Sequence, residues 1–327
     1  MAPTSLQWCA HPQLARDEAL SWWLHRFAWA NAISNHTLTG QLFGGRVFWP
    51  RDVDRFAPIL LVDRCASLLG LSTNRIEAAT LRRYEGILFP RLTIDGWLPW
   101  ITPVGVFHRT QQHHGHAYCP QCLAEGRSIC IAGRLAFEIA CSRHQCLLWD
   151  ACPRCDAPVT FARVELAMAG RFHCPTCGAN LAAAPRRPLV MRALAFEHRC
   201  HAAMRRGFAQ IGTEGVSAAE FFTGTRILLR GLYGRRYLNG LTDASTIRCL
   251  RWAASARPTT PFEHWRLQTR QRPLAALEAY LRDWPEQFLR DAKRSRVYRC
   301  RFESTDATNP SWLADVMAEI EPALTRV

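Results

Sequence analysis

The chain has 327 residues and a formal net charge of +14, and hydrophobic residues make up 48% of it. At about 100–200 residues per domain, this length predicts two or three domains. The positive charge comes almost entirely from arginine, because Lys293 is the only lysine and no Gly-Lys-Ser/Thr triplet exists. Since a Walker A loop requires that triplet, the sequence excludes a P-loop ATPase.

The basic composition points to a partner class. Basic chains attract phosphate backbones and release their counterions, so we expect nucleic acid or a nucleoprotein as partner. The alternative is an acidic protein surface, and a GC-rich genome would also favour arginine over lysine.

Neither a membrane span nor a secretory signal is predicted. Asp63 and Arg64 interrupt the apolar stretch from Ile59 to Leu71, which therefore falls short of the roughly 18 apolar residues that a membrane helix needs. The first ten residues lack a basic start and an apolar core. We expect a cytoplasmic protein without membrane contact.

Fourteen cysteines indicate metal rather than disulfides in a reducing compartment. Seven follow metal-motif spacing between residues 119 and 177. The other seven have no such spacing, and we expect them to be buried as small apolar side chains: Cys9, Cys65, Cys130, Cys146, Cys200, Cys249 and Cys300.

The N-terminal part is predicted to be helical. From Glu18 to Asn31, apolar side chains recur at three- and four-residue steps and form one broad, buried face. They are Leu20, Trp23, Leu24, Phe27 and Ala30.

A helix-turn-helix is predicted in the next helical block. One helix ends at Gly70, where a left-handed residue stops it, and Ser72 caps the next helix, which carries Ile76 inward. In a DNA-binding version, the first three residues of the second helix and two arginines near its far end would contact DNA. The alternative is a helical hairpin whose second helix contacts protein. The candidate contact residues are Thr73, Asn74, Arg75, Arg82 and Arg83.

After Pro185 the sequence becomes helical in pattern and rich in arginine. Ser217 is predicted to cap one helix, Pro273 to stand in the first turn of another, and a last short helix to begin at Trp312. We therefore divide the chain into three domains: residues 1–110, helical with the helix-turn-helix; residues 111–184, two tandem zinc-ribbon or knuckle modules; and residues 185–327, a helical C-terminal domain.

Four pairs of candidate metal ligands occur, each pair three residues apart, so that both side chains converge on one ion. Three pairs are Cys-Pro-x-Cys, and the fourth ends in histidine. The ligands are Cys119 with Cys122, Cys141 with His144, Cys152 with Cys155, and Cys174 with Cys177.

The pairs repeat as a block. Shifting the first four ligands by 33 positions gives the last four. The repeat favours sequential pairing into one Cys₃His and one Cys₄ site, with cross-braced pairing as the alternative. Each set matches a closed tetrahedral zinc site, so we expect two structural zinc ions.

No catalytic site is predicted. His113, His114 and His116 lie upstream of the first cysteine pair but lack an evident carboxylate partner, and an exposed histidine-rich linker is favoured over a metal-dependent nuclease. No serine-histidine-aspartate order or H-E-x-x-H motif is present.

Several segments of the chain resemble the TniQ family of DNA-transposition proteins. The resemblance is most specific in the zinc region, where Tyr118–Cys122, Arg134–Phe137, Cys141–His144 and Cys152–Cys155 carry it. It extends to the helix beginning at Glu18, to Leu68–Ser72, and to Asp283–Glu286.

The resemblance implies a mainly α protein with an N-terminal helix-turn-helix region, two zinc modules and a helical C-terminal region. It also implies a non-catalytic adaptor that links target DNA or a CRISPR guide-RNA complex to an AAA+ transposition regulator, with a possible homodimer. The alternative function is a stand-alone DNA-binding regulator stabilised by zinc. For the helix-turn-helix, the resemblance implies protein docking as the alternative to DNA contact.

Overall fold

The structure is a computed structural model that describes residues 8–43, 49, 52–94, 96–104, 106–107, 111–112, 115–164, 166, 170–232, 261–302 and 308–320. The chain forms two compact units. Unit 1 comprises residues 1–85, 92–135 and 141–187, and unit 2 comprises residues 86–91, 136–140 and 188–327. The division into three domains stays a prediction.

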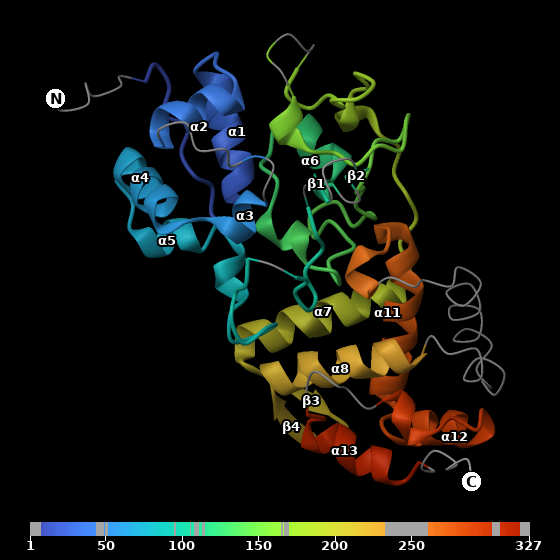
Figure 1. The fold of residues 1–327 in the computed structure, drawn as a ribbon. Coiled ribbons are helices and arrows are strands. Elements are labelled where there is room, and N and C mark those ends of the chain that lie inside the picture. Colours follow the sequence, from blue (N-terminus) through green and yellow to red (C-terminus); the bar gives the residue numbers. More distant parts are fainter. Residues whose placement is uncertain are drawn as a thin grey trace. The chain divides into compact units, whose positions relative to one another are not determined.

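The described chain is mainly α-helical, as predicted (Figure 1). Its strands form two short antiparallel hairpins: β1 (Val106–Phe107) with β2 (Gln111–Gln112), and β3 (Phe208–Ile211) with β4 (Glu214–Ser217). None of the helices in the described ranges combines the length and the apolar character that crossing a bilayer requires.

Unit 1 begins with a helical core. The predicted apolar face of α1 (Leu20–Ala30) is buried at four of its five positions, Leu20, Trp23, Leu24 and Phe27, whereas Ala30 at the helix end is exposed. The helices of this part are α1, α2 (Asn35–Phe43), α3 (Val53–Phe56), α4 (Ile59–Leu69), α5 (Thr73–Glu77) and the 3₁₀ helix η1 (Leu81–Tyr84). α1 also buries Trp22 on another side, where its ring packs edge-on against Phe161.

The helix-turn-helix forms between α4 and α5. Gly70 ends α4 with φ of 63°, and the Ser72 side chain accepts a hydrogen bond from the backbone N–H of Arg75. Ile76 is fully buried, as predicted.

The second helix of this motif is shorter than expected. α5 ends at Glu77, and the Thr80 hydroxyl donates to the Glu77 carbonyl at 2.7 Å. The Thr80 side chain then caps η1, which carries Arg82 and Arg83. These two arginines therefore do not lie at the far end of α5, because a new 3₁₀ turn starts before them.

The rest of unit 1 is mostly irregular backbone with short helices. They are α6 (Pro120–Ala124), η2 (Ile131–Arg134), η3 (Phe161–Arg163) and η4 (Leu181–Ala183). α6 lies beside η4, so the two ends of the cysteine-rich region meet.

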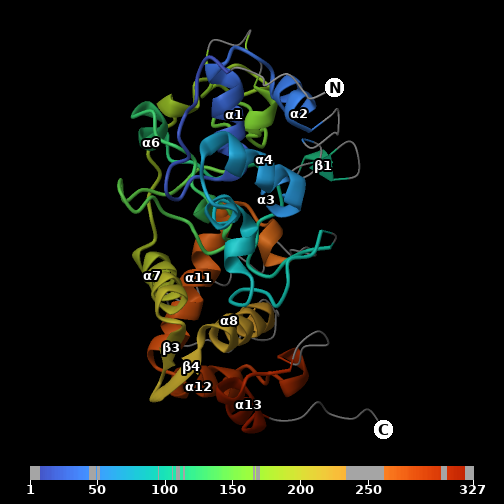
Figure 2. The ribbon, with the colours of Figure 1, turned by 90° about the vertical axis from the view of Figure 1, so that its left-hand side faces the viewer.

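Unit 2 is built around α7 (Met191–Arg206), which packs against α11 (Leu267–Arg282) at a steep crossing angle (Figures 1 and 2). The guanidinium of Arg199 on α7 donates to both carboxylate oxygens of Glu278 on α11 at 2.9 Å. The other helices among the described residues of unit 2 are α8 (Ala218–Leu232), η5 (Phe262–His264), α12 (Glu286–Arg294), η6 (Arg299–Arg301) and α13 (Ser311–Ala318).

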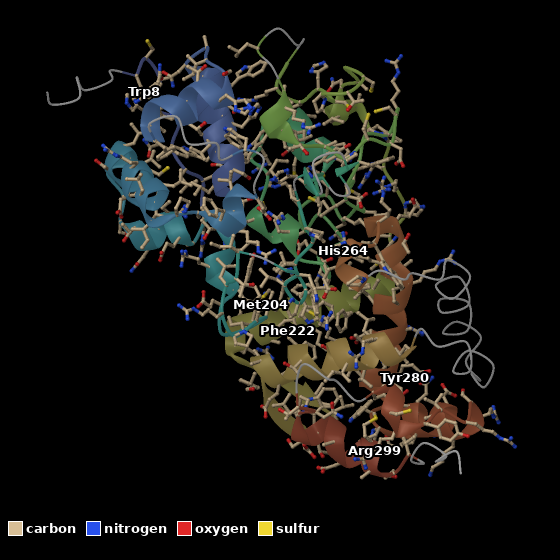
Figure 3. The ribbon with its side chains drawn as sticks, viewed as in Figure 1. Trp8, Met204, Phe222, His264, Tyr280 and Arg299 are labelled. Atoms are coloured by element: carbon tan, nitrogen blue, oxygen red, sulfur yellow. The ribbon has the colours of Figure 1, made fainter. Side chains whose placement is uncertain are left out.

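Aromatic side chains fill the core of unit 2. Phe222 on α8 and Tyr280 on α11 are both almost fully buried (Figure 3). The Phe222 ring stacks on that of Phe137, which unit 2 receives from the segment 136–140.

Two of the three helix boundaries predicted in this unit are correct. Ser217 caps α8 by exchanging hydrogen bonds with Glu220, a capping box, and α13 begins one residue before Trp312. The prediction for Pro273 was wrong, because α11 begins at Leu267 and Pro273 lies inside it. The helix tolerates a proline that donates no backbone hydrogen bond, and Pro273 contributes its ring to the buried face.

Burial was predicted for the seven cysteines without metal-motif spacing, and it is confirmed for three of them. Cys65, Cys146 and Cys200 are buried. For Cys9, Cys130 and Cys300 the prediction was wrong, because their side chains are exposed. Cys249 lies outside the described residues.

Candidate metal centres

The first candidate centre gathers the four predicted ligands Cys119, Cys122, Cys141 and His144. Cys119 is the N-cap of α6, and Pro120 fills the first helical position, so the first turn of the helix presents both cysteines on one side. His144 Nδ1 lies 3.4 Å from the Sγ atoms of Cys119 and Cys122, and 3.5 Å from that of Cys141. All four donor atoms lie within 4.8 Å of one another.

The second candidate centre gathers Cys152, Cys155, Cys174 and Cys177. Sγ of Cys152 lies 3.6 Å from Sγ of Cys177, and Sγ of Cys155 lies 3.7 Å from Sγ of Cys174. Zn–S bonds of about 2.3 Å at tetrahedral angles place sulfur atoms about 3.8 Å apart. Both centres therefore bring together soft donors at the separations that a tetrahedral zinc ion requires.

Three of the four ligand pairs share one backbone turn, which begins at Cys141, Cys152 or Cys174. In each turn the N–H four residues after the first ligand donates to that ligand's carbonyl, at 2.8–3.0 Å. The first ligand's own N–H donates to the carbonyl five residues on, at 2.8–2.9 Å.

The residue four positions after each of these ligands has positive φ. Gly178 suits this position, whereas Gln145 and Asp156 adopt it as non-glycine residues, with φ of 46° and 57°. The fourth pair, Cys119 with Cys122, uses helix α6 instead.

The thiol groups resist deprotonation when no cation is bound. Burial raises the pKa of Cys122 to about 11 and that of Cys152 to about 12, so without an ion these thiols stay protonated at neutral pH. At Cys177 the backbone N–H of Ala179 lowers the pKa to about 7. A divalent cation supplies the positive charge that keeps four such donors deprotonated together.

His144 is oriented by a neighbour outside the ligand set. Its Nε2 lies 2.8 Å from a carboxylate oxygen of Glu125, which raises the pKa of His144 and leaves Nδ1 facing the three cysteines. A carboxylate on the second ring nitrogen of a metal-binding histidine fixes the tautomer in this way. With four side-chain donors, neither centre keeps a coordination position for water.

Cys146 is a neighbour of the first centre that sequence reasoning missed. Its buried Sγ lies 3.8 Å from Sγ of Cys119 and 3.4 Å from the side-chain oxygen of Gln121. It does not belong to the four-ligand group. Its position directly after the turn that begins at Cys141 is the one signal in the sequence that could have indicated this contact.

Most of the candidate contact residues of the helix-turn-helix have partners within the chain. Arg75 donates to the Ala15 carbonyl at 2.8 Å, Arg82 pairs with Glu77 at 3.7 Å, and Arg83 pairs with Asp17 at 3.4 Å. The remaining two, Thr73 and Asn74, are exposed.

The histidines upstream of the first centre do not form a described cluster, since His113 and His114 lie outside the described residues. The prediction of an exposed linker was wrong for His116, which is buried, with its Nε2 3.3 Å from the hydroxyl of Ser21 on α1. Asp54 accepts hydrogen bonds from both the Ser21 hydroxyl and its backbone N–H at 2.8 Å. In a catalytic triad the aspartate instead orients the histidine through Nδ1, and within the described chain Nδ1 of His116 has no partner.

This buried group also contains an arginine. Arg134 is 1% exposed, donates to both carboxylate oxygens of Asp52 and to the Thr102 carbonyl, and lies 3.4 Å from Asp54. Arg134 follows the first cysteine pair, whereas Asp52 caps α3 and Asp54 lies in its first turn. The network therefore joins the cysteine-rich region to the helical core within unit 1.

A comparison with protein families supports the resemblance. The TniQ family model matches residues 9–148. The match contains the helix-turn-helix and all four ligands of the first centre, whereas the second centre lies beyond it. No curated protein matches the chain.

Proposed function

We propose that this chain, which matches the TniQ family model over residues 9–148, is a non-catalytic adaptor that selects transposition targets. It links target DNA or a CRISPR guide-RNA complex to an AAA+ transposition regulator. The family match is the observation that carries this proposal, and it associates the chain with DNA transposition in general. The net charge of +14 supports a nucleic-acid or nucleoprotein partner.

The two candidate centres have a structural role in this proposal. Each holds one zinc ion through its four side chains, and the bound ions supply cross-links between segments of irregular backbone. Zinc binding by comparable sites contributes about 10–16 kcal/mol at neutral pH, which becomes folding energy. Function then resides on the surfaces of the zinc-stabilised unit.

One such surface is the helix-turn-helix. We place nucleic-acid or partner contacts on its second helix and on η1. In this proposal the exposed residues contact the partner directly, while the three arginines exchange their present partners for it. The residues are Thr73, Asn74, Arg75, Arg82 and Arg83.

The proposal is tested by capture experiments with the zinc-loaded chain at moderate salt. The baits are an AAA+ regulator from the same transposon and, separately, the CRISPR guide-RNA complex. We expect capture of the regulator by the wild-type chain and weaker capture by a Thr73→Ala/Asn74→Ala variant. A Thr213→Ala variant serves as the control, because it changes an exposed hydroxyl in unit 2, outside both the helix-turn-helix and the two candidate metal centres.

Failure to capture either bait would contradict the adaptor. Nanomolar binding of a palindromic DNA site by the chain alone, without such capture, would favour the stand-alone regulator instead.

A further inference from the structure

An open groove of about 700 Å³ lies within unit 1, among the end of α1, α6 and the second cysteine module. Its volume falls in the range of about 300–1,000 Å³ that is typical of ligand sites. It is lined by Trp29 from α1, by residues at the end of α6, and by Arg171 and Phe172. No acidic side chain is among its described lining residues.

Arg171 carries a positive charge into this groove. Its guanidinium carbon lies 4.8 Å from the centre of the Phe172 ring, which in turn stacks on buried Trp22 at 5.8 Å and an interplanar angle of 16°. Burial, together with the charge of Arg26, lowers the pKa of Arg171. Among the described residues, no carboxylate or carbonyl accepts a hydrogen bond from this guanidinium. Its contact with the Phe172 ring is joined by a longer-range attraction to the Glu18 carboxylate.

Trp29 is a second donor on the groove wall. Its ring is half-buried and packs against His25 at 6.0 Å. The indole N–H has no acceptor among the described residues, although three other tryptophans of unit 1, Trp23, Trp49 and Trp149, donate to backbone carbonyls. The groove thus offers two donors without acceptors and an aromatic ring.

We infer that this groove binds single-stranded nucleic acid, with Arg171 on a phosphate and a base stacked against Trp29. A phosphodiester supplies the acceptors and the negative charge that the wall lacks. Bases stack on aromatic side chains only when they are free of a duplex, so the exposed part of the indole favours a single strand. The inference rests on the proposed function only in taking nucleic acid as the partner class.

The experiment measures binding of the zinc-loaded full-length chain to fluorescent oligonucleotides over a range of salt concentrations. One sequence is used as single-stranded DNA, as single-stranded RNA and as duplex DNA. The comparison distinguishes DNA from RNA, and single strands from a duplex, as the ligand of the groove. A polyglutamate peptide serves as competitor, to test an acidic protein segment as the occupant.

We expect both single strands to bind more tightly than the duplex. Trp29→Leu should weaken single-strand binding about fivefold or more, as the loss of one stacked base predicts, with the salt dependence unchanged. Arg171→Ala should reduce the slope of log affinity against log salt by about 0.7, the contribution of one phosphate on a single strand. Trp29→Phe should recover most of the affinity.

The matched control is Arg163→Ala, which removes the same charge from an exposed arginine of the same unit that does not line the groove. Unchanged zinc content and circular dichroism establish that each variant is folded. Equal losses for Arg163→Ala and Arg171→Ala, unaltered binding by Trp29→Leu, or displacement by polyglutamate would each overturn the inference. Capture of the AAA+ regulator is measured separately. A result that overturns nucleic-acid binding by the groove therefore leaves the proposed adaptor function untouched.

Discussion

Arg134 and its aspartates show how single residues secure unit 1. A fully buried guanidinium is costly to desolvate, and here two carboxylates and a backbone carbonyl compensate its charge and its donors. The contact joins residues 82 positions apart in the sequence. No periodicity or motif marks such a pair, so sequence reasoning did not find it.

Replacing Arg134 by methionine should lower the free energy of unfolding by about 3–5 kcal/mol, because it leaves buried carboxylates without their partner. Chemical denaturation of the zinc-loaded protein measures the change. The control is Arg127→Met, which removes an exposed arginine paired with Glu125, and we expect it to be nearly neutral. Similar losses for both variants would refute the role given to burial.

At the scale of elements, local rules account for most of what the sequence predicted. The α1 stripe, the Gly70 stop, the Ser72 cap and the capping box of α8 each depend on neighbours within four residues. The end of α5 is also local, since Thr80 hydrogen-bonds to Glu77 and caps η1, but this cap was not recognised in the sequence. The interior place of Pro273 goes with its burial in α11. The ligand spacing indicated both metal centres, whereas the contact of Cys146 with Cys119 required the folded chain.

Two glycines test the backbone argument directly. A Cβ added at either Gly70 or Gly40 meets no atom within 4 Å, but Gly70 has positive φ and Gly40 lies within helix α2. Gly70→Ala should therefore destabilise the protein by about 1–2 kcal/mol. Gly40→Ala should stabilise it by about 0.5–1 kcal/mol, as expected for alanine in a helix. Thermal unfolding compares the two, and a shift of the same sign for both would contradict the assignment of Gly70 as the helix stop.

At the scale of the whole molecule, the two units hold themselves together by different means. Unit 2 has the core of α7, α8 and α11, where Phe196, Phe221 and Leu274 are fully buried. The cysteine-rich part of unit 1 has short helices and irregular backbone, for which two zinc ions are the proposed cross-links. In zinc regions of this kind, the free energy of metal binding stabilises the folded state, so folding depends on the bound ion.

Removal of zinc by a strong chelator should therefore affect the units unequally. We expect amide hydrogen exchange to accelerate across residues 115–135 and 141–184, because the turns of both centres lose their cross-link. Exchange in α11 should change little. Equal acceleration in α11, or continued protection of the cysteine turns, would show that zinc does not support unit 1 selectively.

The central claim is that the chain holds two closed zinc sites with sequentially paired ligands. Native mass spectrometry of the purified chain tests it most directly, alongside Cys141→Ser, Cys152→Ser and the control Cys146→Ser. The account predicts two zinc ions in the wild type and in Cys146→Ser. Each ligand variant should keep one ion, held in the centre that the substitution leaves intact. A single zinc ion in the wild type, or two retained ions in Cys152→Ser, would contradict it.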